Sequence, residues 1–206
     1  MKANPGRSSR PEGWLASIAL LAAAAIVTLF ANHLILTRFP ERPYPRDLLF
    51  ELLPYVSWTR YLTVAALVIG FSVFLYYAPR HEPRRIPAFA AVFGLMYLLR
   101  AVIIMLTPLG SAQGDAAFVL GVQQYGMFPS GHAAASLMLV MLTSAEWAPG
   151  LRRLQALLAT LDIAGLLLAH GHYSIDIIGG LLLAYFVVHV WTDGRLFDPV
   201  KRLTGA

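Results

Sequence analysis

The amino-acid sequence predicts an all-α, polytopic membrane protein with six transmembrane helices and a catalytic site at the outer, membrane-facing end of the bundle. Apolar residues make up 58% of the 206 residues and charged residues only 13%, and the mean hydropathy is +0.63. This apolar content exceeds that of an ordinary soluble domain. Two histidine-containing stretches, residues 128–136 and 169–176, lie where predicted spans begin or end. The composition therefore indicates the membrane class, and the histidines mark the candidate site.

Six apolar runs predict the transmembrane helices. They cover residues 15–36, 61–78, 86–107, 131–147, 154–169 and 175–191. The first run exceeds the apolar core of a signal peptide, which is roughly 7 to 15 residues, so we expect an anchor that is retained. No internal repeat or long polar linker divides the chain. We therefore expect one membrane-embedded domain over residues 1–206, with a loose cytoplasmic leader at 1–13 and a cytoplasmic tail at 192–206.

The basic residues predict the orientation, because lysine and arginine favour the cytoplasmic ends of spans. Eleven lie on one side of the predicted bundle: Lys2, Arg7, Arg10, Arg80, Arg84, Arg85, Arg152, Arg153, Arg195, Lys201 and Arg202. The opposite side holds Arg38, Arg42, Arg46 and Arg60. Both termini are therefore predicted to be cytoplasmic and the histidines extracytoplasmic. Because the net charge of +5 follows this pattern at span ends, we expect no nucleic-acid partner.

The stretch between the first two spans, residues 38–58, combines prolines and charges with a leucine-rich run. Two interpretations stay open, a short amphipathic segment at the membrane interface and an ordinary linker. Aromatic residues near span ends are expected to anchor the bundle at the interface: Trp58, Tyr76, Tyr77, Trp147 and Trp191. The chain has no cysteine, which excludes disulfides and thiolate metal sites.

The stretch FPSGHAAAS, residues 128–136, predicts a helix start that can hold an anion. Ser130 can cap the helix, and Gly131 and the following small residues allow a close first turn. The free backbone N–H groups and the positive end of the helix dipole favour a phosphate there, which places His132 beside it. The alternative interpretation is a capped helix with an incidental histidine.

The second stretch, AHGHYSID at residues 169–176, places His172 four residues before Asp176. On a helix start the carboxylate can accept from one ring nitrogen while the other points outward, as in an oriented nucleophile or base. A zinc site built from His132, His170, His172 and Asp176 is a second interpretation. Histidines at the outer ends of two separate spans favour phosphoryl transfer through a phosphohistidine instead, so we expect no metal and no other cofactor.

Two ionisable residues are predicted to lie within the membrane. Arg100 is seven residues before Thr107, about 10 Å along a helix, and Tyr97 falls on the same side. Asp162 lies at a similar depth in the fifth span. Because buried charges in a membrane usually face a cavity or a partner, Arg100 either lies under the phosphate site, balanced by Asp162, or the two form a structural ion pair.

These motifs resemble the type-2 phosphatidic acid phosphatase superfamily, which carries SGH followed by a distant HxxxD. The AHGHYSID stretch, with Arg84, Arg85 and the YLLRAVIIMLT run, is similar to the sphingomyelin synthase branch, and the resemblance covers about residues 43–184. It implies six spans and a catalytic triad on His132, His172 and Asp176. The implied activity moves a phosphocholine- or phosphoethanolamine-type headgroup from a membrane phospholipid to a lipid alcohol such as ceramide or diacylglycerol.

The remaining candidate residues are those expected to bind substrate. They are Ser130, Gly131, Arg100, Tyr97, Asp115 and Tyr173. Of the branch's proline-rich first motif only Pro43, Pro45 and Asp47 are present, and its Cys-Gly-Asp appears as Gly114 and Asp115 without the cysteine. The FPSGHAA stretch resembles the phosphatase side, so a lipid phosphate phosphatase or a phospholipase C-like hydrolase of the same superfamily is the alternative function.

The number of cations near the site favours a diester substrate. Related phosphatases carry an arginine six residues before the second histidine, and Leu166 stands there in this chain. A phosphomonoester brings nearly two negative charges and favours several basic partners, whereas a diester brings one. A transporter or channel subunit would also explain Arg100 and Asp162, but no span is visibly broken and the reactive residues cluster at one face. We therefore expect an integral membrane enzyme acting on lipids at the extracytoplasmic face.

Overall fold

The computed structural model describes residues 11–112 and 126–204, and every regular element within these ranges is helical. The elements are α1 (Pro11–Arg38), α2 (Leu48–Leu52), α3 (Thr59–His81), the 3-10 turn η1 (Pro83–Arg85), α4 (Ile86–Leu106), α5 (Gly131–Leu142), α6 (Leu151–Leu168), α7 (Ser174–Asp193) and α8 (Asp198–Thr204). The predicted all-α class is confirmed. Each of the six predicted spans corresponds to one helix, in order α1, α3, α4, α5, α6 and α7.

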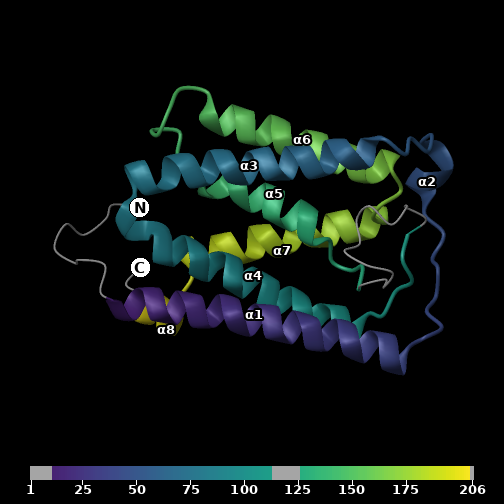
Figure 1. The fold of residues 1–206 in the computed structure, drawn as a ribbon, viewed down its shortest axis with the longest axis horizontal. Coiled ribbons are helices and arrows are strands. Elements are labelled where there is room, and N and C mark those ends of the chain that lie inside the picture. The colour runs from purple at the N-terminus through teal and green to yellow at the C-terminus, as the bar shows by residue number, and fades with distance from the viewer. Residues whose placement is uncertain (1–10, 113–125, 205–206) are drawn as a thin grey trace.

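The long helices pack as a bundle (Figure 1). Helix α1 lies along α4, α3 lies along α6, and α5 packs between α6 and α7. The core between these helices combines aromatic rings with very small side chains. Phe74 packs edge to face against Phe89, whereas Ala134 and Ala135 of α5 are fully buried. The small residues allow α5 to lie in the centre of the bundle, because helices approach closely only where side chains are short.

Four of the described helices are long and apolar enough to cross a membrane by length and composition. They are α1, α3, α4 with the preceding turn η1, and α7. Helix α5 has only 12 residues, and α6 carries Arg152, Arg153 and Asp162 among its 18. An integral membrane protein is therefore supported, and six spans remain a prediction.

Helix α5 ends five residues before the predicted boundary at Trp147. Thr143 leaves the helix with φ −74° and ψ 118°, and its hydroxyl donates to the carbonyl of Leu139 at 2.6 Å. A threonine hydroxyl that bonds the preceding turn competes with continuation of the helix. Ala145 and Trp147 led to the longer predicted span, although the backbone has already left the helix at Thr143.

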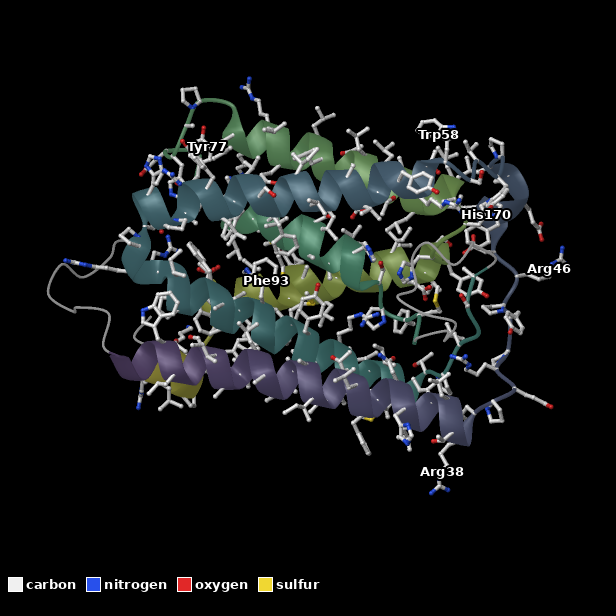
Figure 2. The ribbon with its side chains drawn as sticks, viewed as in Figure 1. Arg38, Arg46, Trp58, Tyr77, Phe93 and His170 are labelled. Carbon is white, nitrogen blue, oxygen red and sulfur yellow. The ribbon has the colours of Figure 1, made fainter. Side chains whose placement is uncertain are left out.

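Two ends of the bundle are distinguishable. The start of α1 lies against α8 at one end, where a Cβ on Gly13 would meet the carbonyl oxygen of Thr204 at 2.7 Å. Tyr77 lies toward that end, Phe93 lies in the middle, and His170 lies at the opposite end with Arg46 and Trp58 (Figure 2). The candidate site residues of the second histidine stretch are therefore at the end away from α8.

Candidate active site at one end of the bundle

The start of α5 has the predicted capped geometry. Ser130 is the N-cap with φ −64° and ψ 120°, and its side-chain oxygen accepts from the N–H of Ala133 at 3.3 Å. The N–H of Ser130 donates to the carbonyl oxygen of Asp176 at 2.8 Å. This last bond joins the two histidine stretches directly, because Asp176 lies in the first turn of α7. The predicted helix start at Gly131 is confirmed.

The start of α7 brings His172 and Asp176 together in a way that differs from the expected helix face. The helix begins at Ser174, so His172 lies before it, in the connecting turn. Asp176 Oδ2 accepts from the backbone N–H of Tyr173 at 3.1 Å and lies 3.3 Å from His172 Nδ1. One carboxylate oxygen therefore caps the helix and contacts the imidazole at once. His172 is 9% exposed and Asp176 is fully buried, so the pair is shielded from solvent.

The two histidines face each other across a short gap. The ring centroids of His132 and His172 are 6.1 Å apart, with the ring planes at 57°. Reacting atoms are typically about 3 to 3.5 Å apart before a bond forms. The two rings are therefore close enough for both imidazole groups to contact one phosphate group. The site predicted from two stretches 40 positions apart is brought together by α5 and α7.

Arg100 contacts the loop that leads into α5. Its Nε donates to the carbonyl oxygen of Pro129 at 2.8 Å and its Nη2 to that of Gly126 at 3.3 Å. A Cβ on Gly131 would lie 3.1 Å from Arg100 Nε, so the guanidinium is adjacent to the first residue of the helix. The predicted position of Arg100 beside the start of α5 therefore agrees with the structure, and phosphate binding there stays a prediction.

Asp162 contacts a different part of the bundle. Its Oδ2 accepts from the hydroxyl of Ser136 at 2.6 Å, and the residue is fully buried between α5 and α6. Within the described residues, Arg100 and Asp162 form no ion pair. Neither the structural ion pair nor the balancing of Arg100 by Asp162 is therefore observed. Sequence reasoning placed both at similar depth but had no means of finding Ser136 as the partner.

The other predicted substrate-binding residues differ in position. Tyr97 is partly buried on α4 against the main core, one turn before Arg100. Tyr173 is 4% exposed, and burial, followed by the charge of Asp176, raises the pKa of its phenol. The ring packs 5.7 Å from Phe50. Asp115 lies outside the described residues.

The stretch between α1 and α3 makes contacts with the site that sequence reasoning did not predict. It contains the five-residue helix α2, whose N-cap Asp47 accepts from Leu49 N–H at 2.9 Å and from Ser174 N–H at 2.6 Å. Phe50 stacks on His170 with centroids 4.2 Å apart. We call residues 43–56 the α2 segment. Aspartate before a leucine-rich run is an N-cap signal, which could have indicated the helix but not its distant partner.

The zinc interpretation has little support at this site. Within residues 11–112 and 126–204, no group of three or more His, Cys, Asp or Glu side chains is arranged to hold a metal ion. His170, which that interpretation required, is 6% exposed and is enclosed by the rings of Phe50 and Tyr55.

Comparison with known proteins identifies the same part of the chain. Residues 127–193, which hold both histidines and Asp176, match the PAP2 superfamily C-terminal family. The chain is also 27% identical, over 205 residues, to phosphatidylcholine:ceramide cholinephosphotransferase 1 of Caenorhabditis elegans. That match covers 82% of this chain and 42% of the relative, so the chain spans less than half the length of the curated relative.

These findings agree with the site geometry. They support, at the level of the family, a membrane-embedded lipid phosphotransferase or phosphatase. The resemblance that the motifs indicated is confirmed: this chain is similar to the sphingomyelin synthase-like branch of the PAP2 superfamily.

Proposed function

We propose that this protein transfers the headgroup of a membrane phospholipid to a lipid alcohol through a phosphohistidine on His172. The observation that carries the proposal is the pair of histidine rings with centroids 6.1 Å apart, in which His172 Nδ1 lies 3.3 Å from Asp176 Oδ2. Asp176 favours the tautomer with the proton on His172 Nδ1, which leaves a lone pair on Nε2. His172 is therefore the nucleophile and His132 the proton donor and acceptor.

In the first step, His172 Nε2 forms a bond to phosphorus while the bond from phosphorus to the diacylglycerol oxygen breaks. His132 gives its proton to that oxygen, so diacylglycerol leaves as a neutral alcohol. In the second step, His132 takes the proton of the incoming lipid hydroxyl, whose oxygen attacks phosphorus. The P–N bond then breaks and its electron pair returns to His172, which restores both histidines.

The charges near the site support a phosphodiester donor. A diester carries one negative charge, which Arg100 and the N–H groups at the start of α5 can balance. A phosphomonoester carries nearly two and would require further cations. Donors of the phosphatidylcholine or phosphatidylethanolamine type and acceptors such as ceramide or diacylglycerol fit this requirement.

The resemblance of FPSGHAA to the phosphatase side favours a second candidate. In that reaction water replaces the lipid alcohol in the second step, and the same two histidines act. The protein would then be a lipid phosphate phosphatase or a phospholipase C-like hydrolase.

The test uses the purified chain in liposomes that contain headgroup-labelled phosphatidylcholine or phosphatidylethanolamine, with and without ceramide or diacylglycerol. We expect label on the lipid alcohol, and label released into water would favour hydrolysis.

With a donor that has a good leaving group, His132→Ala should retain label on the protein, whereas His172→Ala should not. His189→Ala is the control, since His189 pairs with Asp193 at the same 3.3 Å but is exposed. Label on His172→Ala and none on His132→Ala would reverse the two roles.

A further inference from the structure

Two carboxylates, from parts of the chain 129 positions apart, bind the first amides of the catalytic helix α7. The Tyr173 N–H donates to Asp176 Oδ2 at 3.1 Å, and the adjacent Ser174 N–H donates to Asp47 Oδ2 at 2.6 Å. The first N–H groups of a helix have no partner within the helix and need an external acceptor. The N-cap residue Tyr173 makes no side-chain capping bond, so the hydrogen bonds from outside the backbone at this helix start come from these carboxylates.

Asp47 is held in place for this role. It is 8% exposed, and its second oxygen, Oδ1, accepts from Leu49 N–H at 2.9 Å and so caps α2. The α2 segment is attached to the site end at two further points. Phe50 stacks on His170 at 4.2 Å, and the Val56 N–H donates to the carbonyl oxygen of Leu168 at 2.7 Å. The carboxylate is therefore held by its bond to α2, and α2 is itself attached to the site end.

We infer that Asp47 is a positioning residue that keeps Asp176 on His172 by occupying the neighbouring amide of α7. If Asp47 were removed, the Ser174 N–H at this part-buried helix start would lose its acceptor. The nearest carboxylate in the same turn is Asp176, which already binds the Tyr173 N–H through Oδ2 and has no hydrogen-bond partner for Oδ1 within the described residues. Rotation of Asp176 toward the free amide moves Oδ2 away from His172 Nδ1.

The consequence for His172 concerns its tautomer. The contact between Nδ1 and Asp176 Oδ2 is 3.3 Å, at the long end of the hydrogen-bond range, so a small rotation of the carboxylate breaks it. Without that acceptor the proton distributes between Nδ1 and Nε2. Only the Nδ1-protonated tautomer has its lone pair on Nε2, so the fraction of competent nucleophile falls. This role rests on the proposed function of His172, although the effect on the tautomer does not.

The test compares Asp47→Ala and Asp47→Asn with Glu51→Ala in headgroup transfer. Glu51 is on the same short helix but pairs with the exposed Arg46, so its variant should keep wild-type activity. We expect Asp47→Ala to lower kcat by about 10- to 100-fold, the range found for residues that orient a catalytic group. Asp47→Asn keeps one acceptor oxygen and serves if the alanine variant does not fold.

A double-mutant cycle with Asp176→Asn separates positioning from general support of the fold. If Asp47 acts through Asp176, then Asp47→Ala should have little further effect in the Asp176→Asn background. Independent factors that multiply would overturn the inference, even if each single variant is impaired.

The second readout does not require activity. The protein is labelled with 15N-histidine, and the His172 signals are assigned by their loss in His172→Gln. In the wild type the His172 nitrogen shifts should report protonation at Nδ1. In Asp47→Ala they should move toward the values of a mixture of tautomers. Unchanged shifts in both Asp47 variants would overturn the inference. Changed shifts in a protein whose wild type transfers no headgroup would refute the proposed function and leave the positioning role standing.

Discussion

At the scale of single residues, the site depends on one oxygen atom that has two tasks. Asp176 Oδ2 caps α7 through the Tyr173 N–H and contacts His172 Nδ1. The capping bond holds the carboxylate rigidly, because it belongs to the same turn of backbone. The imidazole is oriented by a group that is itself oriented by the helix start, and this coupling is what an effective base or nucleophile requires.

This arrangement predicts a large effect of Asp176→Asn with little change in stability. The amide oxygen can still accept from Tyr173 N–H, but it is a weaker acceptor for His172 and the amide N–H₂ cannot accept at all. We expect headgroup transfer to fall by about 10²- to 10⁴-fold, the usual contribution of a positioned acid or base, as measured by initial rates in liposomes.

The matched control is Asp193→Asn. His189 and Asp193 have the same spacing and the same 3.3 Å contact as His172 and Asp176, but their side chains are 55% and 64% exposed. The activity of the Asp193→Asn variant should equal that of the wild type. Equal losses in the two variants would mean that the assay responds to the folding of α7 instead of the site.

The hydrogen-bond partners that spacing alone located are close in the chain. Ser130 caps α5 three residues on, and His172 meets Asp176 four residues on, so spacing alone indicated both. The partners it could not locate are distant. Asp47 meets Ser174 across 127 positions and Ser136 meets Asp162 across 26, and no local pattern encodes either pairing.

At the scale of elements, glycines set the distance between the helices that carry the site. A Cβ added at Gly180 of α7 would overlap the carbonyl oxygen of Ser130, the cap of α5. A Cβ added at Gly165 of α6 would overlap the hydroxyl of Thr63 on α3. Both are close approaches between helices, but only the first lies beneath the histidines.

The two glycines predict different defects. Gly180→Ala should push the start of α5 away from α7 and change the separation of His132 and His172, which costs about 10²-fold in rate for a shift near 1 Å. Gly165→Ala should lower the free energy of unfolding by about 1 to 3 kcal/mol through overpacking, with little effect on the rate of the folded enzyme. Thermal unfolding in detergent and liposome assays on the same samples would separate the two. Identical profiles for both variants would contradict the assignment.

At the scale of the whole molecule, the bundle has a site end and an α8 end. The start of α1 and α8 lie together at the second, and His170 lies at the first (Figures 1 and 2). Apolar runs located the long helices because the hydropathy pattern is local. They did not locate the end of α5, where the backbone leaves the helix at Thr143, before the predicted boundary at Trp147. They also did not give the order of packing, which depends on contacts across the bundle.

The distribution of basic residues predicts which end faces the cytoplasm. Cysteines introduced into this cysteine-free chain make the test direct. Ser111→Cys lies after α4 at the site end, in the loop where Gly110 N–H donates to the carbonyl oxygen of Pro43. Ala145→Cys lies after α5 and is exposed. In sealed vesicles of known orientation, an impermeant maleimide should label the first from the extracytoplasmic side and the second from the cytoplasmic side. The reverse pattern would invert the topology.

The shortness of α5 has a consequence for which acceptor is used. Its 12 residues rise about 18 Å, less than the roughly 30 Å of a bilayer core, and its start lies farther inside the bundle than the nearby end of α1 (Figure 1). Under the proposed reaction, a donor lipid would present its phosphorus to His132 and His172 below the level of neighbouring headgroups. At that depth water would be scarcer than among the headgroups, whereas the hydroxyl of ceramide or diacylglycerol would lie close to the phosphorus. The length of one helix would therefore set the partition of the covalent intermediate between transfer and hydrolysis.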